Sequence, residues 1–186
     1  MRKLKLQVQI SVDGFIAGPQ GAMDWIEWNW GDDINAYVSE ITRPVDTILL
    51  GRKLAEGFIP TWEERAKEPD AATNGSEKFT QTPKVVFSRS MSSSPWERTR
   101  IANELVANVN ELKNSNGGNI MAYGGGEFVS SLIREGLIDE FYLFINPTIL
   151  GTGMPIFSLI ESPQKLKLIE AKTFSCGITV LHYSTL

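Results

Sequence analysis

Three short apolar segments of this chain each end in glycine or in a cluster of polar and basic residues, and this pattern constrains the fold more than any other. They read LLGRK at 49–53, VFSRS at 86–90 and AYGGG at 122–126. Each apolar run has the length and character of a buried strand, and the small or polar residues mark where it ends. Strands of this kind separated by helical patterns predict an open α/β sheet. In such a sheet, ligands bind outside the carboxyl ends of the strands.

Other segments extend this pattern along the chain. An alternating run opens the sequence as KLKLQVQISV, and the spacing of apolar residues after Asp33 predicts an amphipathic helix that stops near Pro44. The run NIMAYG predicts a strand that leads into the helix EFVSSLIREG, and IDEFYLFINPTIL predicts a longer strand. Two alternating runs around Ser175 to Gly177 predict a closing antiparallel hairpin.

Two further segments have less regular patterns. The run LVANV at 105–109 is interpreted as a strand that precedes a short polar helix, and the polar, proline-containing stretch 58–83 as a long surface excursion. With 186 residues and no repeat or linker, the chain is expected to form a single domain over residues 1–186. The predicted class is α/β, with a mostly parallel central sheet and an antiparallel C-terminal hairpin.

Composition excludes several classes of function. A formal net charge of −4 provides no overall attraction to nucleic acid or to an anionic membrane. The chain has one cysteine, Cys176, and one histidine, His182, which excludes an internal disulfide framework and argues against a zinc site. The N-terminal residues lack the apolar core of a signal peptide, so the expected location is the cytoplasm.

The glycine run at 124–126 stands between a strand and a helix, where unpaired backbone N–H groups can hold a phosphate. Arg52 and Arg89, with the hydroxyl groups of Ser88 and Ser90, add further donors at neighbouring strand ends. Each piece also has a structural interpretation, as a tight helix start or as a surface ion pair. The chain contains neither G-x-G-x-x-G nor a P-loop, so a nucleotide site here requires a different fold.

Taken together, the motifs resemble the dihydrofolate reductase superfamily. They are most similar to the branch of the C-terminal reductase domain of the bifunctional riboflavin-biosynthesis deaminase/reductase. The resemblance covers essentially the whole chain and is carried, in order, by SVDGFIAG, MDW, LLGRK, VFSRS, YGGGEFVSSL and GLIDEFYLFINPTILGTGMPIF. It implies a three-layer fold with helices on both faces of the sheet, and NADPH as the hydride donor.

The resemblance also implies which residues bind the cofactor. Gly51 and Arg52 match the family's first cofactor turn, and Ser88 and Arg89 match its serine-arginine near the adenosine 2′-phosphate. The pyrophosphate turn corresponds to Gly124, Gly125, Gly126 and Glu127. The family often has threonine after its glycine-arginine-lysine, where this chain has Leu54.

On the substrate side, reduction of a polar double bond needs a proton source, and a carboxyl group commonly supplies it. The likeness of AMDWIEWNWGDDI to the reductases' tryptophan loop and following helix implies Asp33 as the catalytic carboxylate, although Asp33 could also be a helix N-cap. Tyr37 lies one turn further along, and both are expected to line the substrate site. Trp25, Trp28 and Trp30 could stack on a heterocycle or pack in a core or dimer interface.

Two types of substrate are compatible with these residues. One is a pterin or folate, and the other is 5-amino-6-(5-phosphoribosylamino)uracil, although residues 21–42 contain no lysine or arginine to hold its phosphate. The alternative function is a catalytically silent nucleotide-binding or interaction protein that keeps the fold. The apolar strand FYLFINPTIL further suggests a homodimer, formed by pairing across a two-fold axis.

Overall fold

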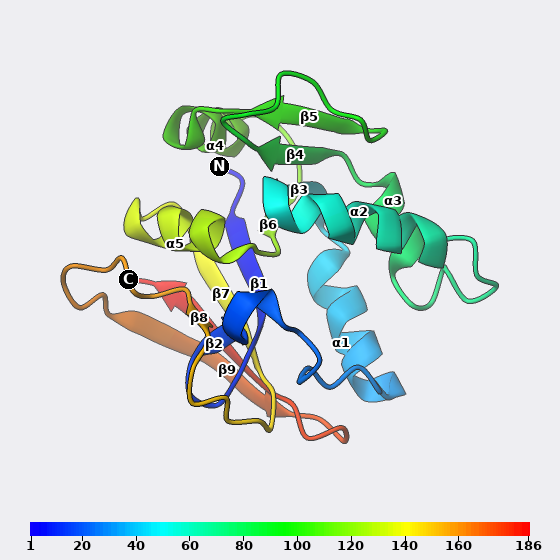
Figure 1. Ribbon diagram of the computed structural model, residues 1–186, viewed down its shortest axis with the longest axis vertical. Coiled ribbons are helices and arrows are strands. Elements are labelled where there is room, and N and C mark those ends of the chain that lie inside the picture. The colour runs from blue at the N-terminus through cyan, green and yellow to red at the C-terminus, as the bar shows by residue number, and fades with distance from the viewer.

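A computed structural model describes all residues, 1–186, and shows an eight-stranded mixed sheet with helices on both faces (Figure 1). The sheet has the order β5-β4-β3-β6-β1-β7-β10-β9, and β2 and β8 form a separate antiparallel pair. The strands are β1 (Leu4–Ile10), β2 (Phe15–Ala17), β3 (Val45–Gly51), β4 (Lys84–Phe87), β5 (Thr99–Ala102), β6 (Asn119–Ala122), β7 (Glu140–Ile145), β8 (Met154–Pro155), β9 (Leu166–Thr173) and β10 (Thr179–Thr185). The helices are α1 (Asp32–Thr42), α2 (Arg52–Arg65), α3 (Ser76–Gln81), α4 (Leu105–Asn114) and α5 (Gly126–Arg134), with a 3-10 turn at Pro19–Gly21.

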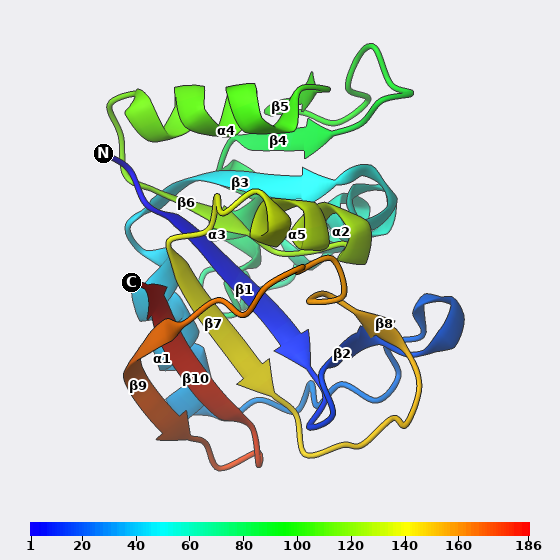
Figure 2. The same ribbon diagram turned by 90° about the vertical axis from the view of Figure 1, so that its left-hand side faces the viewer.

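The sheet is parallel from β5 to β7, and β10 pairs antiparallel with both β7 and β9. This confirms the predicted α/β class, including the mostly parallel sheet and its C-terminal hairpin. The parallel strands β3, β5 and β6, which lead into α2, α4 and α5, therefore end at the same edge of the sheet (Figure 2). No helix is long and apolar enough to span a bilayer.

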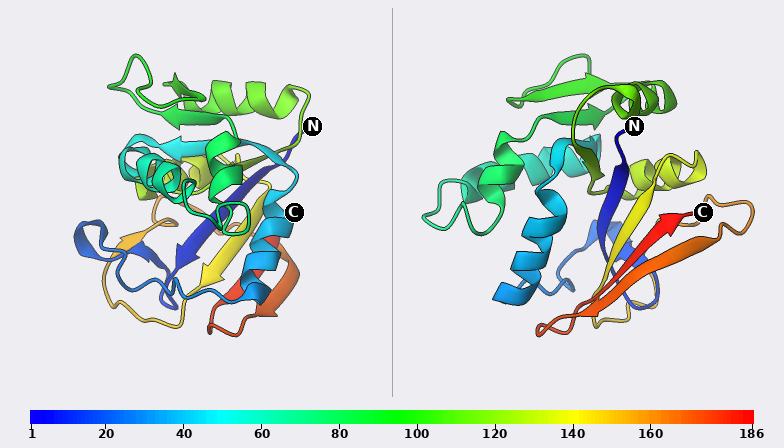
Figure 3. Two further views of the ribbon diagram at one scale, coloured as in Figure 1. Left: turned by 90° about the vertical axis from the view of Figure 1, so that its right-hand side faces the viewer. Right: turned by 180° about the vertical axis from the view of Figure 1, so that it is seen from behind.

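Helices cover the two faces of the sheet through separate apolar clusters. The alternating β1 places Leu4, Leu6 and Val8 on one face, where they pack with residues of α4 and α5. On the opposite face, α1 packs on β7 and β10, while α2 and α3 pack on β3 and β6. In Figure 3, α1 stands apart from α2 and α3 on this second face.

Three sequence-based assignments need correction. The run LVANV belongs to helix α4, not to a strand, because Leu105, Val109 and Leu112 share one helical face that packs on the sheet. The strand before it is β5. The stretch 58–83 is not simply an excursion, because α2 continues through Pro60 and α3 follows. The aromatic rings of Phe58, Trp62 and Phe79 hold these two helices together.

The third correction concerns β7, which is shorter than the segment IDEFYLFINPTIL. It lies inside the sheet, with both edges hydrogen-bonded to β1 and β10. The predicted pairing of this strand across a two-fold axis is therefore wrong. A homodimer would have to form through another surface.

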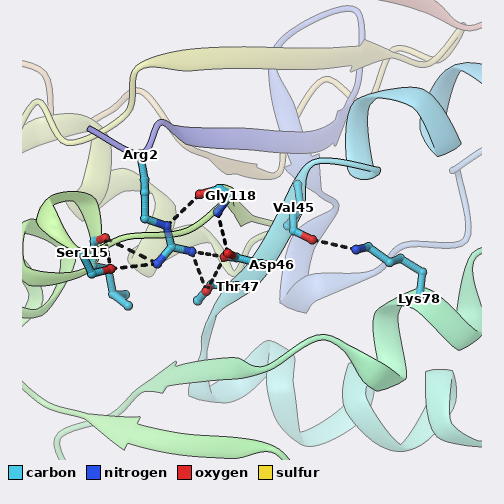
Figure 4. Close-up of polar contacts among 8 residues, drawn as sticks. Arg2, Val45, Asp46, Thr47, Lys78, Ser115 and Gly118 are labelled. Carbon is cyan, nitrogen blue, oxygen red and sulfur yellow. Dashed lines mark hydrogen bonds and ion pairs between the residues drawn. The ribbon is translucent and has the colours of Figure 1, made fainter.

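A buried arginine links the start of the chain to β3 and to the turn before β6 (Figure 4). The Arg2 guanidinium donates from Nε to the Gly118 carbonyl oxygen at 2.7 Å and from one terminal nitrogen to the Thr47 hydroxyl at 2.8 Å. It also forms an ion pair with Asp46, whose second carboxylate oxygen accepts from the Gly118 N–H. Because Arg2 is only 8% exposed, it depends on these partners to offset the loss of solvation.

A second cluster of polar side chains surrounds the buried Glu140. Its carboxylate lies 2.6 Å from Nζ of Lys3 and 3.3 Å from Nζ of Lys5, and it accepts a hydrogen bond from the Tyr142 hydroxyl at 3.2 Å. His182 stacks on Tyr142 with ring centroids 4.0 Å apart. Burial alone would raise the pKa of Glu140, but the hydrogen bond from Lys3 and the charges of Lys5 and Lys3 hold it at about 2.

This cluster predicts how stability depends on pH. The pKa of Glu140 is lower in the folded than in the unfolded chain. Ionised Glu140 therefore stabilises the folded state above the unfolded pKa of 4.5, and this stabilisation is lost as the pH falls toward 2. We expect a loss of about 2 kcal/mol by roughly pH 3. Urea unfolding over a pH series should show a flatter acid dependence in Glu140→Gln. An equally steep acid dependence in that variant would contradict the assignment.

Candidate functional site

One large cavity, of about 1600 Å³, lies over the sheet face between α1 on one side and α2 and α3 on the other. It opens at the edge where β3, β4 and β6 end, because Gly51, Ser88 and the glycines at 124–126 all line it. Small-molecule sites usually measure about 300–1000 Å³, so this cavity has room for a dinucleotide and a second ligand. The three strand-end motifs thus meet at one site, as their sequence pattern indicates.

Two helix N-termini adjoin at this edge. The Gly51 N–H donates to the Gly124 carbonyl oxygen at 3.2 Å, which ties the start of α2 to the glycine run before α5. Gly51 is the N-cap of α2 and Gly125 is the N-cap of α5, and no side chain caps either helix. The first N–H groups of both helices are therefore available to an anion, and both helix dipoles favour one.

The glycines at this edge differ in backbone conformation and in how much space surrounds their Cα atoms. Gly124 has a φ of 142°, a conformation that side chains rarely adopt, and a Cβ there would meet Leu54 at 3.3 Å. A Cβ at Gly125 would meet only the Leu54 Cβ, at 3.8 Å, so the space in front of this helix start is open. At Gly51, in contrast, a Cβ would lie 2.8 Å from the Cβ of Phe128. Gly51 and Gly124 therefore serve the helix contact, while Gly125 leaves room for a ligand.

The polar side chains beside the two helix N-termini differ in whether they are already paired within the protein. The Ser88 hydroxyl oxygen accepts from the N–H groups of Ser90 and Met91, which shapes the turn after β4. Arg89 is exposed on this turn, and no carboxylate of the chain pairs with it. Arg52 pairs with Glu56 at 2.6 Å, one helical turn away, and Glu127 lies 3.6 Å from Lys53. Arg89 is thus the cation at this edge that is most available to a ligand.

Asp33 does not line the cavity, and its predicted position there is wrong. Its carboxylate accepts hydrogen bonds from the Ser175 N–H at 2.8 Å and the Ser175 hydroxyl at 3.1 Å, in the turn between β9 and β10. The Ser175 N–H and the other donors lower its pKa. Asp33 therefore links the start of α1 to the turn of the C-terminal hairpin.

Tyr37 and Trp25 are also not brought to the cavity. Tyr37 is buried between α1 and the hairpin, where its hydroxyl donates to Glu170 at 3.1 Å. The Trp25 indole N–H donates to the Ala22 carbonyl oxygen, within its own loop. Trp28 and Trp30 do line the cavity, and Trp30 stacks on Phe144 with ring centroids 6.2 Å apart.

Gln7 and Gln9 also line the cavity, although no motif of the sequence marks them as site residues. The alternation of β1 places both on the face opposite to Leu6 and Val8, so the period of this strand was an available signal. What the sequence did not reveal is that this face lines a cleft instead of packing under a helix. Leu54, which stands where the family often has threonine, packs against the glycine run.

Fold and cavity together define an α/β protein whose ligand site lies at the carboxyl edge of a mostly parallel sheet, where two uncapped helices begin. Comparison with known families refines this class, because the RibD C-terminal domain matches residues 2–180. The chain therefore belongs to the RibD C-terminal domain family, which confirms the resemblance found in its motifs.

Individual relatives extend over the full chain. The uncharacterized protein YyaP of Bacillus subtilis (strain 168) is 32% identical over 185 residues, which cover 98% of this chain and 94% of that protein. A crystal structure of a putative riboflavin biosynthesis protein from Shewanella sp. PV-4 superposes with a TM-score of 0.73 at 23% identity, covering 100% of this chain and 99% of the other.

A second solved structure is longer than this chain. It is a diaminohydroxyphosphoribosylaminopyrimidine deaminase/5-amino-6-(5-phosphoribosylamino)uracil reductase from Thermotoga maritima, with a TM-score of 0.68 and 19% identity. The match covers 100% of this chain and 57% of that one. At these identities the two structures establish the fold alone, which agrees with membership of the RibD C-terminal domain family.

Proposed function

We propose that this protein is an NADPH-dependent reductase that transfers a hydride to a nitrogen heterocycle. The observation that carries the proposal is the meeting of three strand ends at one cavity, where the N-termini of α2 and α5 are uncapped. Membership of the RibD C-terminal domain family supports the same reaction class.

The residues at the cavity fit such a cofactor. The open space in front of Gly125 admits a pyrophosphate to the first N–H groups of α5, where the helix dipole stabilises its charge. Arg89, with Ser88 on the same turn, would hold the 2′-phosphate of the adenosine, and Arg52 would contribute a further positive charge near α2. Gly51 would keep the two helix starts close together. When bound, NADPH supplies the hydride, and the chain supplies position and electrostatics.

The cofactor can be tested directly by calorimetry. We expect NADPH to bind with a micromolar dissociation constant and NADH to bind more weakly, because only NADPH carries the 2′-phosphate. In Arg89→Ala, the affinity for NADPH should fall about tenfold while the affinity for NADH stays the same, since one charge-assisted contact is removed. Lys67→Ala is the control, because Lys67 is an exposed cation that pairs only with Glu64.

One result would count against the cofactor and another against the role of Arg89. Absence of NADPH binding at micromolar concentrations would refute the cofactor assignment. An unchanged preference for NADPH over NADH in Arg89→Ala would remove Arg89 from the 2′-phosphate site and leave the cofactor itself in place.

A second candidate function is favoured by one observation. Asp33, the carboxylate expected to assist proton transfer, is engaged with Ser175 outside the cavity. A protein that binds a nucleotide without turning over a substrate would have this arrangement. Oxidation of NADPH in the presence of dihydrofolate or of the deaminated riboflavin precursor separates the two functions. Turnover with either compound excludes the silent protein.

A further inference from the structure

A series of aromatic rings ends in an exposed tryptophan on one wall of the cavity. Phe144 is fully buried on the sheet, and the half-buried Trp30 stacks on it at an interplanar angle of 16°. The ring centroid of Trp28 lies 6.1 Å from that of Trp30, and Trp28 is 53% exposed although it lines the cavity. A further flat ring stacked on Trp28 would extend this series and remove apolar surface from water.

The loop that carries the two tryptophans is anchored to the sheet. The Trp30 indole N–H donates to the Glu27 carbonyl oxygen at 2.8 Å, and the Trp30 backbone N–H donates to the Trp28 carbonyl oxygen at 2.9 Å. The Glu27 N–H in turn donates at 2.9 Å to the side chain of Asn146, which is fully buried just after β7. This part of the wall is therefore organised before a ligand arrives, which lowers the entropy cost of binding.

The opposite wall of the cavity is aromatic as well. Phe58 and Trp62 of α2 line it together with Tyr123, which stands between β6 and the glycine run, and all three are half-buried. They surround the buried Phe79 of α3, whose ring centroid lies 5.2 Å from that of Phe58 and 5.3 Å from that of Trp62. Because aromatic rings stand on both the α1 side and the α2 side, the cavity suits a flat ligand.

The polar groups of the cavity restrict the chemistry of such a ligand. On the floor, the Gln9 Oε1 atom accepts from the Asn146 side chain at 2.9 Å, and the Gln7 Oε1 atom is buried below the surface. The lining carboxylates are Glu40, which is exposed on α1, and Glu127, which is exposed at the cofactor edge, and no histidine or cysteine lines the cavity. The usual proton donors, a histidine or an enclosed carboxyl group, are thus missing. This favours an uncharged acceptor that needs no proton from the protein.

We propose that the cavity binds planar quinones of two fused rings, stacked on Trp28, and that the protein reduces them as a second class of substrate. The quinone takes a hydride, which is two electrons and one proton, from NADPH at one carbonyl oxygen. The other carbonyl oxygen takes a proton from water, and the products are the hydroquinone and NADP⁺. This activity goes beyond the proposed heterocycle and rests on the proposed function for its hydride donor, although the stacking itself needs no cofactor.

The test compares two quinones that differ in the number of rings. In 2,3-dimethyl-1,4-naphthoquinone and in tetramethyl-1,4-benzoquinone every quinone ring position is blocked, so neither adds to the free thiol of Cys176. Titrations followed by NMR should show that the two-ring compound binds about tenfold more tightly, because its second ring stacks on Trp28. Trp28→Ala should weaken binding of the two-ring compound about tenfold and bring it to the level of the one-ring compound. Phe157→Ala is the matched control, because Phe157 is an aromatic residue 37% exposed outside the cavity.

A second measurement follows the reaction itself. Addition of the naphthoquinone should cause oxidation of NADPH that depends on the protein, and Trp28→Ala should raise KM about tenfold while kcat stays the same. Equal naphthoquinone affinity in folded Trp28→Ala overturns the proposal, as does a complete absence of naphthoquinone binding. A protein that binds both NADPH and the quinone without oxidising NADPH also overturns it. Absence of NADPH binding would instead count against the reductase, so the two failures are distinguishable.

Discussion

Gly125→Asp is expected to abolish most NADPH binding and to leave the fold as stable as before. Gly125 is the N-cap of α5, with a φ of −32°, and a Cβ there would touch only Leu54 at 3.8 Å. Aspartate is among the best N-cap residues, because its carboxylate accepts from the first-turn N–H groups. The substitution therefore occupies the donors proposed for the pyrophosphate and adds a negative charge beside it.

The expected loss of NADPH affinity is about 100-fold, or roughly 3 kcal/mol, from lost charge-assisted hydrogen bonds and like-charge repulsion. Stability should change by less than about 0.5 kcal/mol, because glycine and aspartate differ only slightly as N-caps. Calorimetry gives the affinity and thermal unfolding the stability.

Gly125→Asn is the matched control, with the same shape and no charge. It should bind NADPH more tightly than Gly125→Asp, and the difference between the two measures the effect of charge alone. A folded Gly125→Asp that binds NADPH as the unsubstituted protein does would show that the phosphates lie elsewhere.

Local patterns were sufficient to predict most of the fold. The alternation of β1, the apolar runs of β3, β4 and β6 and the terminal hairpin were each visible within a short stretch of sequence. The error at LVANV has a physical basis, since a five-residue apolar run fits a buried strand and a helix face equally well. The stretch expected to be a surface excursion begins inside α2, which continues through Pro60, and Phe58 and Trp62 on either side of the proline pack with Phe79 of α3.

The cavity also has one part that local sequence patterns predict and another that they do not. The meeting of the three strand-end motifs at one cavity could be predicted, since parallel strands bring their carboxyl ends to one edge regardless of the side chains between them. The side of the cavity proposed for a substrate depends on contacts between distant residues. Asp33 is removed from the cleft by Ser175, 142 residues further along the chain, and no local pattern contains that contact. The position of Gln7 in the cavity depends likewise on the space between α1 and α3, which is a tertiary feature.

Arg2→Met is expected to cost about 3 kcal/mol of unfolding free energy, because it leaves partners of a buried guanidinium unsatisfied. The Gly118 carbonyl oxygen and the Thr47 hydroxyl would lose their donor, and Asp46 would keep only its bond from the Gly118 N–H and its contact with Thr47. The midpoint of thermal unfolding should fall by about 10 °C for a chain of this size. Urea unfolding gives the same free energy independently.

Arg134→Met serves as the control for removing an arginine that pairs only at the surface. Its partner is the adjacent Glu135, its side chain is 49% exposed, and we expect a cost of less than about 0.5 kcal/mol. Equal costs for the two variants would mean that the buried network contributes no more than a surface ion pair. The Arg2 network lies at the start of β3, whereas the proposed phosphate seat lies beyond its end at Gly51. Folded Arg2→Met should therefore bind NADPH normally, the reverse of the behaviour expected of Gly125→Asp.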